Sequence, residues 1–182
     1  MRLENSFEVP ASPEATWALL NDVPRIVPCM PGAELEEVVD ENTWQATMHV
    51  KLGPIALAFA THLTRDEADD AARIVRLSAK AREKKGRGGA QATIESAMRE
   101  TESGTHVSIT TDLTLQGAVA QYGRGVVADV AAQLTRQFAD CLATQLQSES
   151  PPPAPESVRP VGGLRLGLGA LWRSFLGLFR RG

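Results

Sequence analysis

The sequence has little of what secreted, metal-binding or membrane-spanning proteins need. Its 182 residues include two cysteines, Cys29 and Cys141, which form no disulfide framework and suit a reducing compartment. No run of roughly 18 apolar residues exists, so no transmembrane helix is predicted. The N-terminus lacks the apolar run of a signal peptide. These absences make the cytoplasm the expected location.

Histidine is also scarce, and its placement argues against metal chemistry. His49, His62 and His106 have no metal-ligand spacing, and neither cysteine is close to one of them in sequence. A zinc site or a nucleophilic site is therefore not expected. His49 and His62 fall on the polar side of their strands and are expected to face water.

Charge is distributed unevenly along the chain. Residues 151–182 contain five arginines and one glutamate, a net charge of +4, which leaves −7 for residues 1–150. A body this acidic is a poor candidate for binding nucleic acid. One basic hairpin stands out within it, and we interpret it as a solvated edge or a loop that docks a partner. Its cations are Lys80, Arg82, Lys84, Lys85 and Arg87.

The body alternates between polar and apolar residues over most of its length, as half-buried strands do. A first strand is predicted over 3–9. Ser12 and Pro13 then start a helix that ends near Asn21, and a second short helix follows and ends before Pro28. Short connections join the later strands into an antiparallel meander. These strands are predicted over 35–39, 43–50, 54–64, 72–82, 90–99 and 106–116.

A helical period takes over in residues 121–147, with apolar residues four apart in a wide stripe. A helix this long needs an apolar surface opposite it, and the concave face of the sheet supplies one. The expected fold is therefore α+β with a helix-grip architecture. It has two short helices after strand 1, and a curved antiparallel sheet of about 6–7 strands wraps around the long C-terminal helix. A filled core is the alternative to an internal apolar cavity.

The predicted cavity is lined by apolar and aromatic residues from both layers. Tyr122 matters most among them, because its hydroxyl can give a polar handle at the start of the long helix. The predicted lining is Trp17, Leu20, Met30, Trp44, Met48, Leu57, Phe59, Leu113, Tyr122, Val126 and Val130. Arg76 and Lys80 share the parity of Ile74 and are the candidate inward cations. A cavity without an acid and base pair holds a ligand but does not transform it.

Three segments follow from these patterns: a domain over 1–147, a proline-rich linker over 148–163 and an amphipathic helix over 164–182. On a helical wheel the last segment places leucine, tryptophan and phenylalanine on one face and arginines opposite or beside it. This pattern is typical of helices that lie in the membrane interface. A protein groove or the chain's own domain are the alternative docking sites. The predicted membrane-binding residues are Leu164, Arg165, Leu168, Leu171, Trp172, Arg173, Phe175, Leu178, Phe179, Arg180 and Arg181.

Several short motifs resemble the CoxG family of carbon monoxide dehydrogenase, a member of the START/Bet v 1-like (SRPBCC) helix-grip superfamily. They are Val23-Pro24-Arg25, Cys29-Met30-Pro31-Gly32-Ala33, Val50-Lys51-Leu52-Gly53-Pro54, Leu115-Gln116-Gly117 and Ala120-Gln121-Tyr122-Gly123-Arg124-Gly125. The resemblance covers about residues 1–147. It implies a helix-grip fold and a non-catalytic accessory protein. The implied partner is a molybdenum-containing CO dehydrogenase or a related hydroxylase, which the protein helps bring to the cytoplasmic membrane.

The residue patterns and the resemblance combine into one hypothesis. The protein is not an enzyme and has no cofactor of its own, but its apolar cavity accepts a lipid or a respiratory quinone, menaquinone or ubiquinone. It resides in the cytoplasm and attaches peripherally to the inner face of the cell membrane. The alternatives are a cyclase or dehydratase of the same superfamily, and a scaffold without a ligand. Arg124 is expected to contact the partner enzyme or to cap a loop.

Overall fold

One antiparallel sheet and three α-helices make up residues 1–52 and 55–148, the part of the chain described by the computed structural model. The predicted linker, apart from Ser148, and the predicted membrane helix lie outside the described residues. The elements are β1 (Arg2–Val9), α1 (Pro13–Leu20), α2 (Val23–Ile26), η1 (Val27–Cys29), β2 (Ala33–Asp40), β3 (Thr43–Leu52), β4 (Ile55–Asp69), β5 (Ile74–Glu83), β6 (Gly88–Thr101), β7 (Gly104–Gly117), η2 (Ala118–Gln121) and α3 (Arg124–Ser148).

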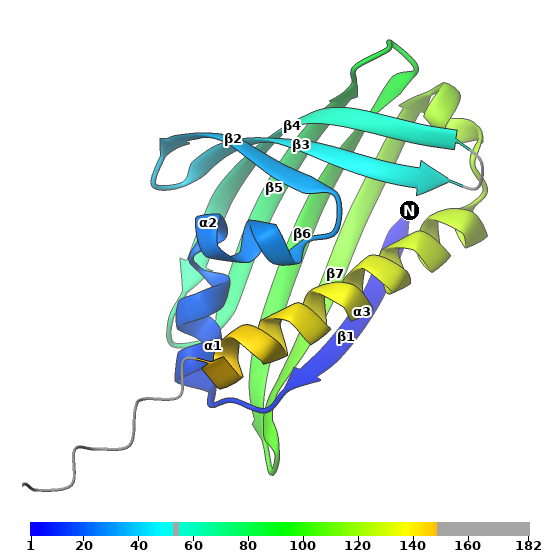
Figure 1. Ribbon diagram of the computed structural model, residues 1–182. Helices are drawn as coiled ribbons and strands as arrows, with labels where there is room; N and C mark the ends of the chain where they lie inside the picture. Colours follow the sequence, from blue (N-terminus) through cyan, green and yellow to red (C-terminus); the bar gives the residue numbers. More distant parts are fainter. Residues whose placement is uncertain (53–54, 149–182) are drawn as a thin grey trace, which may run out of the picture. The chain divides into compact units, whose positions relative to one another are not determined.

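The seven strands form a single sheet in the order β1-β7-β6-β5-β4-β3-β2, in which all neighbours are antiparallel. Strands β2 to β7 are a meander, and β1 joins its far edge by pairing with the last strand. The sheet curls so that β2, β3 and β4 face α3, which runs across the concave side (Figure 1). The predicted helix-grip fold is thereby confirmed.

Local sequence explains how the two short helices sit between β1 and β2. The Ser12 hydroxyl accepts a hydrogen bond from the Ala15 amide at 3.3 Å, and Pro13 occupies the first turn of α1. Asp22 caps α2 in the same way through the Arg25 amide. Gly32 then turns the chain into β2 with φ +80°, and a Cβ there would lie 2.3 Å from the His49 carbonyl oxygen. Only glycine fits this turn.

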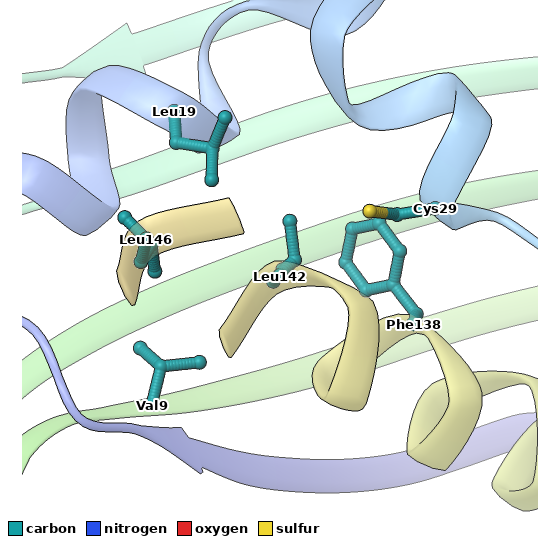
Figure 2. Close-up of a cluster of buried hydrophobic side chains, with 6 residues drawn as sticks. All are labelled: Val9, Leu19, Cys29, Phe138, Leu142 and Leu146. Carbon is teal, nitrogen blue, oxygen red and sulfur yellow. The ribbon is translucent and has the colours of Figure 1, made fainter. Parts of the chain in front are cut away.

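The C-terminal half of α3 anchors the helix to the rest of the domain. Phe138, Leu142 and Leu146 share one face and are buried against Val9 and Leu19 (Figure 2). Phe138 also meets the ring of Phe7 edge-on, with the two ring centroids 6.1 Å apart. Burying each of these large side chains contributes about 1.5–3 kcal/mol. This cluster, which we call the anchor cluster, holds α3 mainly on β1, η1 and α1.

Two further clusters fill the opposite ends of the concave face. The first, below α1, comprises Trp17, Val75, Met98 and Val107. The second, the far cluster, lies near the start of α3. It comprises Leu57, Phe59 and Val119, with Met48, Val50, Ala81, Leu115, Tyr122 and Val130 packed against them. The apolar core is therefore divided into three parts.

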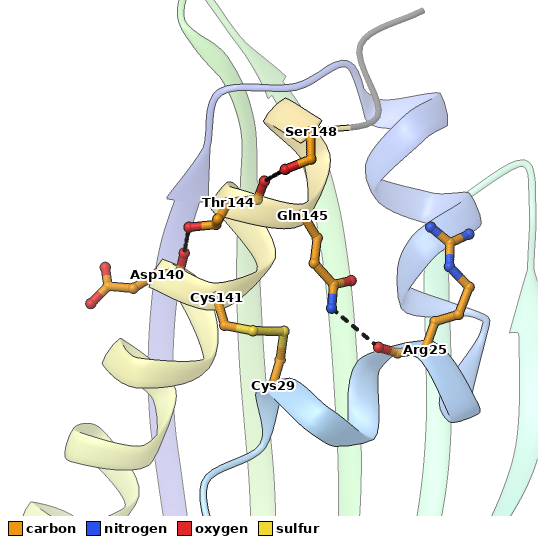
Figure 3. Close-up of a disulfide and its surroundings, with 7 residues drawn as sticks. All are labelled: Arg25, Cys29, Asp140, Cys141, Thr144, Gln145 and Ser148. Carbon is orange, nitrogen blue, oxygen red and sulfur yellow. Dashed lines mark hydrogen bonds between the residues drawn. A yellow bond between two sulfur atoms is a disulfide. The ribbon is translucent and has the colours of Figure 1, made fainter.

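Cys29 and Cys141 are joined in a disulfide that ties η1 to α3, with their Cα atoms 5.3 Å apart (Figure 3). The expectation that the two cysteines form no disulfide was wrong, because their separation of 112 residues hides the contact that the fold creates. Gln145 reinforces this junction by donating a hydrogen bond to the Arg25 carbonyl oxygen at 3.4 Å. The cysteine pattern consequently loses its value as an indicator of a reducing compartment.

Strand β4 is longer than predicted and contains acids that the sequence placed in a turn. Asp66 and Glu67 belong to the strand, which continues to Asp69 after a register shift between Arg65 and Glu67. A bulge of this kind lets a strand bend while its pairing continues. The bend brings the end of β4 under α1, where the Trp17 indole donates a hydrogen bond to Asp70.

The disulfide should contribute substantially to stability, since it closes a loop of more than a hundred residues. We expect the double variant Cys29→Ala/Cys141→Ala to lose about 2–5 kcal/mol of unfolding free energy. Urea unfolding followed by circular dichroism measures this loss. Reductant should destabilise the natural protein similarly and leave the variant unchanged. Natural protein that ignores reductant and matches the variant would show that the thiols do not pair.

Candidate functional site

The middle of the concave face is lined with small side chains. Ala79 pairs with Ala92, and Ala81 pairs with Ala90, on the neighbouring strands β5 and β6. Successive residues of a strand alternate between its two faces, and these four share the inner parity of Leu113 and Leu115 on β7. Alanine leaves the concave face deep where leucine or phenylalanine would fill it.

The central row of this inner face is not covered by the core clusters. It runs across four strands from Leu63 through Ala79 and Ala92 to Leu113, and all four residues are half-buried. None of the four belongs to the three clusters described above. Ile94, one step along β6, is also half-buried and outside them. We call this surface the alanine floor. An apolar surface left partly open in the interior of a domain is suited to binding an apolar ligand.

The predicted cavity residues surround this floor at different depths. Met48, Leu57, Phe59, Tyr122 and Val130 gather in the far cluster. At the other end, Trp17 lies in the cluster below α1, and Leu20 and Met30 pack against the anchor cluster. Trp44 is buried, and Leu113 belongs to the floor itself. Val126 differs from the rest, because it is 44% exposed near the N-terminal end of α3. The role of these residues as a ligand lining stays a prediction.

An arginine that the sequence analysis did not identify secures the Trp44 end of the floor. The Arg65 guanidinium lies 5.4 Å from the centre of the Trp44 ring. It donates hydrogen bonds to the Asn21 carbonyl oxygen at 2.9 Å, the Asn42 side-chain oxygen at 2.9 Å and the Glu41 carbonyl oxygen at 2.8 Å. Arg65 thereby fastens the β2–β3 hairpin to the end of α1, using neutral acceptors.

The inner face carries one buried acid that sequence reasoning missed. Glu83, at the end of β5, is 2% exposed and shares the parity of Ala79 and Ala81. Its carboxylate accepts backbone hydrogen bonds from Arg87 at 3.0 Å and Lys85 at 2.8 Å, and the bond from Arg87 is the main reason that its pKa is lowered. Glu83 therefore shapes the β5–β6 hairpin as an ionised acceptor. A parity count along β5 could have placed it inward.

The two cations expected on the inner face lie on the outer face instead. Arg76 forms ion pairs with Glu67 and with Glu95, the latter at 2.8 Å. Lys80 is exposed. The prediction assumed that Ile74 faces inward, although it lies on the outer parity, in register with Asp69 and Ala97. Across the described residues the inner face thus presents no acid and base pair of the kind that proton-transfer chemistry needs.

The remaining polar predictions are met in part. His49 and His62 are exposed, as expected, whereas His106 is half-buried with its Nδ1 3.5 Å from Glu8. In residues 1–52 and 55–148 no three potential ligands gather into a metal site. Arg124 donates a hydrogen bond to the Arg2 carbonyl oxygen at 3.1 Å and so ties the start of α3 to β1.

This geometry can be compared with known proteins. The family model of CoxG, described as a subunit of carbon monoxide dehydrogenase, matches residues 6–147, which is most of the chain. The chain belongs to the CoxG family. This confirms the resemblance drawn from the short motifs. No curated protein matches the chain.

Solved structures share the fold of this CoxG-family chain at low identity. A conserved protein from Geobacillus kaustophilus has a TM-score of 0.72 and 17% identity, covering 81% of this chain and 96% of that one. The ZhuI aromatase/cyclase from Streptomyces sp. R1128 has a TM-score of 0.59 and 14% identity, covering 90% and 99%. A START superfamily protein from Mycobacterium smegmatis has a TM-score of 0.55 and 12% identity, covering 81% and 97%. The fold is therefore START/Bet v 1-like, and it is shared with at least one enzyme.

Within the described ranges, no helix of this CoxG-family chain combines the length and the apolar character needed to cross a bilayer.

We expect Glu83→Ala to lower the melting temperature at neutral pH, because two buried amides lose their acceptor. A lowered pKa means that the carboxylate stabilises the folded state above the unfolded pKa, and that this contribution disappears as pH falls through the folded pKa. The difference between the variant and the natural protein should therefore shrink below about pH 4. Thermal melts across pH measure it.

Glu102→Ala is the matched control, since Glu102 is an exposed acid in the β6–β7 turn. It should leave the melting temperature nearly unchanged at every pH. An equal effect of the two variants would contradict the hairpin role of Glu83.

Proposed function

We propose that this CoxG-family protein is a non-catalytic accessory factor that carries an apolar ligand, a lipid or a respiratory quinone, on the alanine floor. In the same proposal it brings a molybdenum-containing CO dehydrogenase or a related hydroxylase to the inner face of the cytoplasmic membrane. Such an enzyme is soluble and must pass electrons to a quinone, and quinones dissolve in lipid. A tethered carrier connects the two phases.

The observation that carries the proposal is the open, apolar middle of the inner face. Ala79 and Ala92 form its deepest part, and Leu63 and Leu113 flank them in register. Four half-buried apolar residues in one row are costly to leave in contact with water. A ligand with a flat ring and an isoprenoid chain removes that cost, since it has no charge to satisfy.

The anchoring pattern of α3 supports the same function. Phe138 and Leu142 fix the C-terminal half of the helix, whereas Val126 near its other end is exposed. Gly123 and Gly125 flank the first turn, and a Cβ at either position would meet nothing within 4 Å. A helix held firmly at one end and loosely at the other offers a ligand a route to the floor.

A cyclase-type enzyme is the second candidate, and it is favoured by the shared fold with an aromatase/cyclase. Such an enzyme has to move protons on its substrate. The one buried acid of the described inner face, Glu83, is occupied by backbone amides of its own hairpin. The carrier function fits these residues better than catalysis does.

Filling the alanine floor should abolish ligand binding without unfolding the domain. We expect Ala92→Phe, purified from a quinone-containing host and extracted with organic solvent, to yield far less quinone or lipid than the natural protein. Ala79→Phe is a second variant at the facing position. Chromatography with mass spectrometry identifies the extract, and circular dichroism checks the fold.

The matched control is Thr93→Phe, which adds a similar side chain to an exposed outer position of the same strand. It should retain the ligand. Natural protein that yields neither quinone nor lipid at any stoichiometry would refute the carrier function, as would equal loss from Thr93→Phe.

Membrane recruitment rests on the C-terminal residues, which carry a net charge of +4. We expect a chain lacking residues 151–182 to keep its circular dichroism spectrum and to lose flotation with vesicles containing phosphatidylglycerol. Each arginine near an anionic surface is worth about 1 kcal/mol, so Arg173→Glu/Arg180→Glu in the full chain should also weaken flotation. Full-length protein that ignores anionic vesicles would refute this part of the proposal.

A further inference from the structure

The outer face of the sheet contains a second hollow, separate from the alanine floor. Its volume is about 720 Å³, within the range of sites that bind a specific ligand. It crosses the middle strands beside the β5–β6 hairpin. Its lining is polar and includes Gln45, His62, Lys80, Arg82, Gln91 and Gln116. We call it the outer groove.

Strand register makes the outer groove a continuous polar track. Gln45 pairs with His62, His62 with Lys80 and Lys80 with Gln91, so these four side chains form one row across β3 to β6. Arg82 begins the adjacent row. Strands lie about 4.8 Å apart, so the distance from β3 to β7 is about 19 Å. Five or six residues of an extended peptide have about that length.

The charge of the groove is positive and uncompensated. Among the residues that the structure describes, neither Lys80 nor Arg82 forms an ion pair. The one acid in the lining, Glu36, is engaged by the Thr47 hydroxyl and by Lys84 at 3.2 Å, and these contacts lower its pKa. The groove therefore keeps a net attraction for anions within a body whose total charge is −7.

The lining also leaves a peptide backbone room and partners. Ala60, Gly88 and Gly89 have small or no side chains, so a chain can approach the sheet closely. The amides of Gln91 and Gln116 both donate and accept hydrogen bonds, as a peptide backbone requires. A recessed track suits a single strand, whereas the planar surface of a bilayer would reach only its rim.

We infer that the outer groove binds an acidic, extended segment of a partner protein, with Lys80 and Arg82 contacting its carboxylates. The inference rests on the proposed recruitment function, which supplies a protein partner, and does not depend on the ligand of the alanine floor. The basic β5–β6 hairpin would guide the segment into place, since clustered charge accelerates encounter.

The test uses the full-length chain and a short fluorescein-labelled oligoglutamate peptide in fluorescence anisotropy. The double variant Lys80→Glu/Arg82→Glu should bind the peptide about tenfold more weakly, because two attractive contacts become repulsive. The milder Lys80→Gln/Arg82→Gln should lie between the two. Arg99→Glu/Arg136→Glu is the matched control, as it reverses two exposed cations outside the groove. It should bind nearly as well as the natural protein.

Other outcomes would overturn the inference. Equal weakening by the matched control would show that net charge alone attracts the peptide. Loss of flotation with phosphatidylglycerol vesicles in the groove variant, with peptide binding unchanged, would assign the groove to the membrane. The groove variant should keep its extracted quinone or lipid and its flotation, so failure here is distinct from failure of the carrier or membrane function.

Discussion

The docking of one half of α3 determines how the rest of the domain is arranged. Phe138, Leu142 and Leu146 bury one face of the helix against β1 and α1, and the Cys29–Cys141 disulfide fastens the same region to η1. A helix held this firmly along the β1 edge cannot also press on the middle of a strongly curved sheet. The clusters at the two ends of the concave face then do the remaining packing, and the centre between them stays shallowly covered.

Small side chains are the sequence counterpart of that geometry. Ala79, Ala81, Ala90 and Ala92 occupy paired inner positions where a filled core would carry leucine or phenylalanine. Interiors are normally packed to the density of organic crystals, and a single missing methylene is already felt. Four adjacent alanines therefore mark a position where packing gives way to space. The same use of small residues appears outside, where Ala60 and Gly89 line the outer groove.

Periodicity predicted the architecture because burial on one face of a sheet imposes it directly. The alternation in β3, β4 and β7 and the four-residue stripe of α3 each report a local constraint, and all the predicted elements exist with shifted ends. The disulfide could not be read in this way, because Cys29 and Cys141 become neighbours only after the whole sheet is formed. Ile74 misled the parity of β5, since an apolar residue at a strand end need not face the core.

The polar residues show most clearly where sequence reasoning ends. Glu83 breaks the apolar pattern of the inner face, and its partners are backbone amides that no side-chain motif announces. Arg65 behaves similarly, because two of its acceptors are the carbonyl oxygens of Asn21 and Glu41. Once these charges are assigned to structure, Lys80 and Arg82 are the cations of the groove lining that the described fold leaves without a carboxylate. The curved sheet thus separates two chemistries, with an apolar surface inside that suits a lipid-soluble ligand and a cationic track outside that suits a protein.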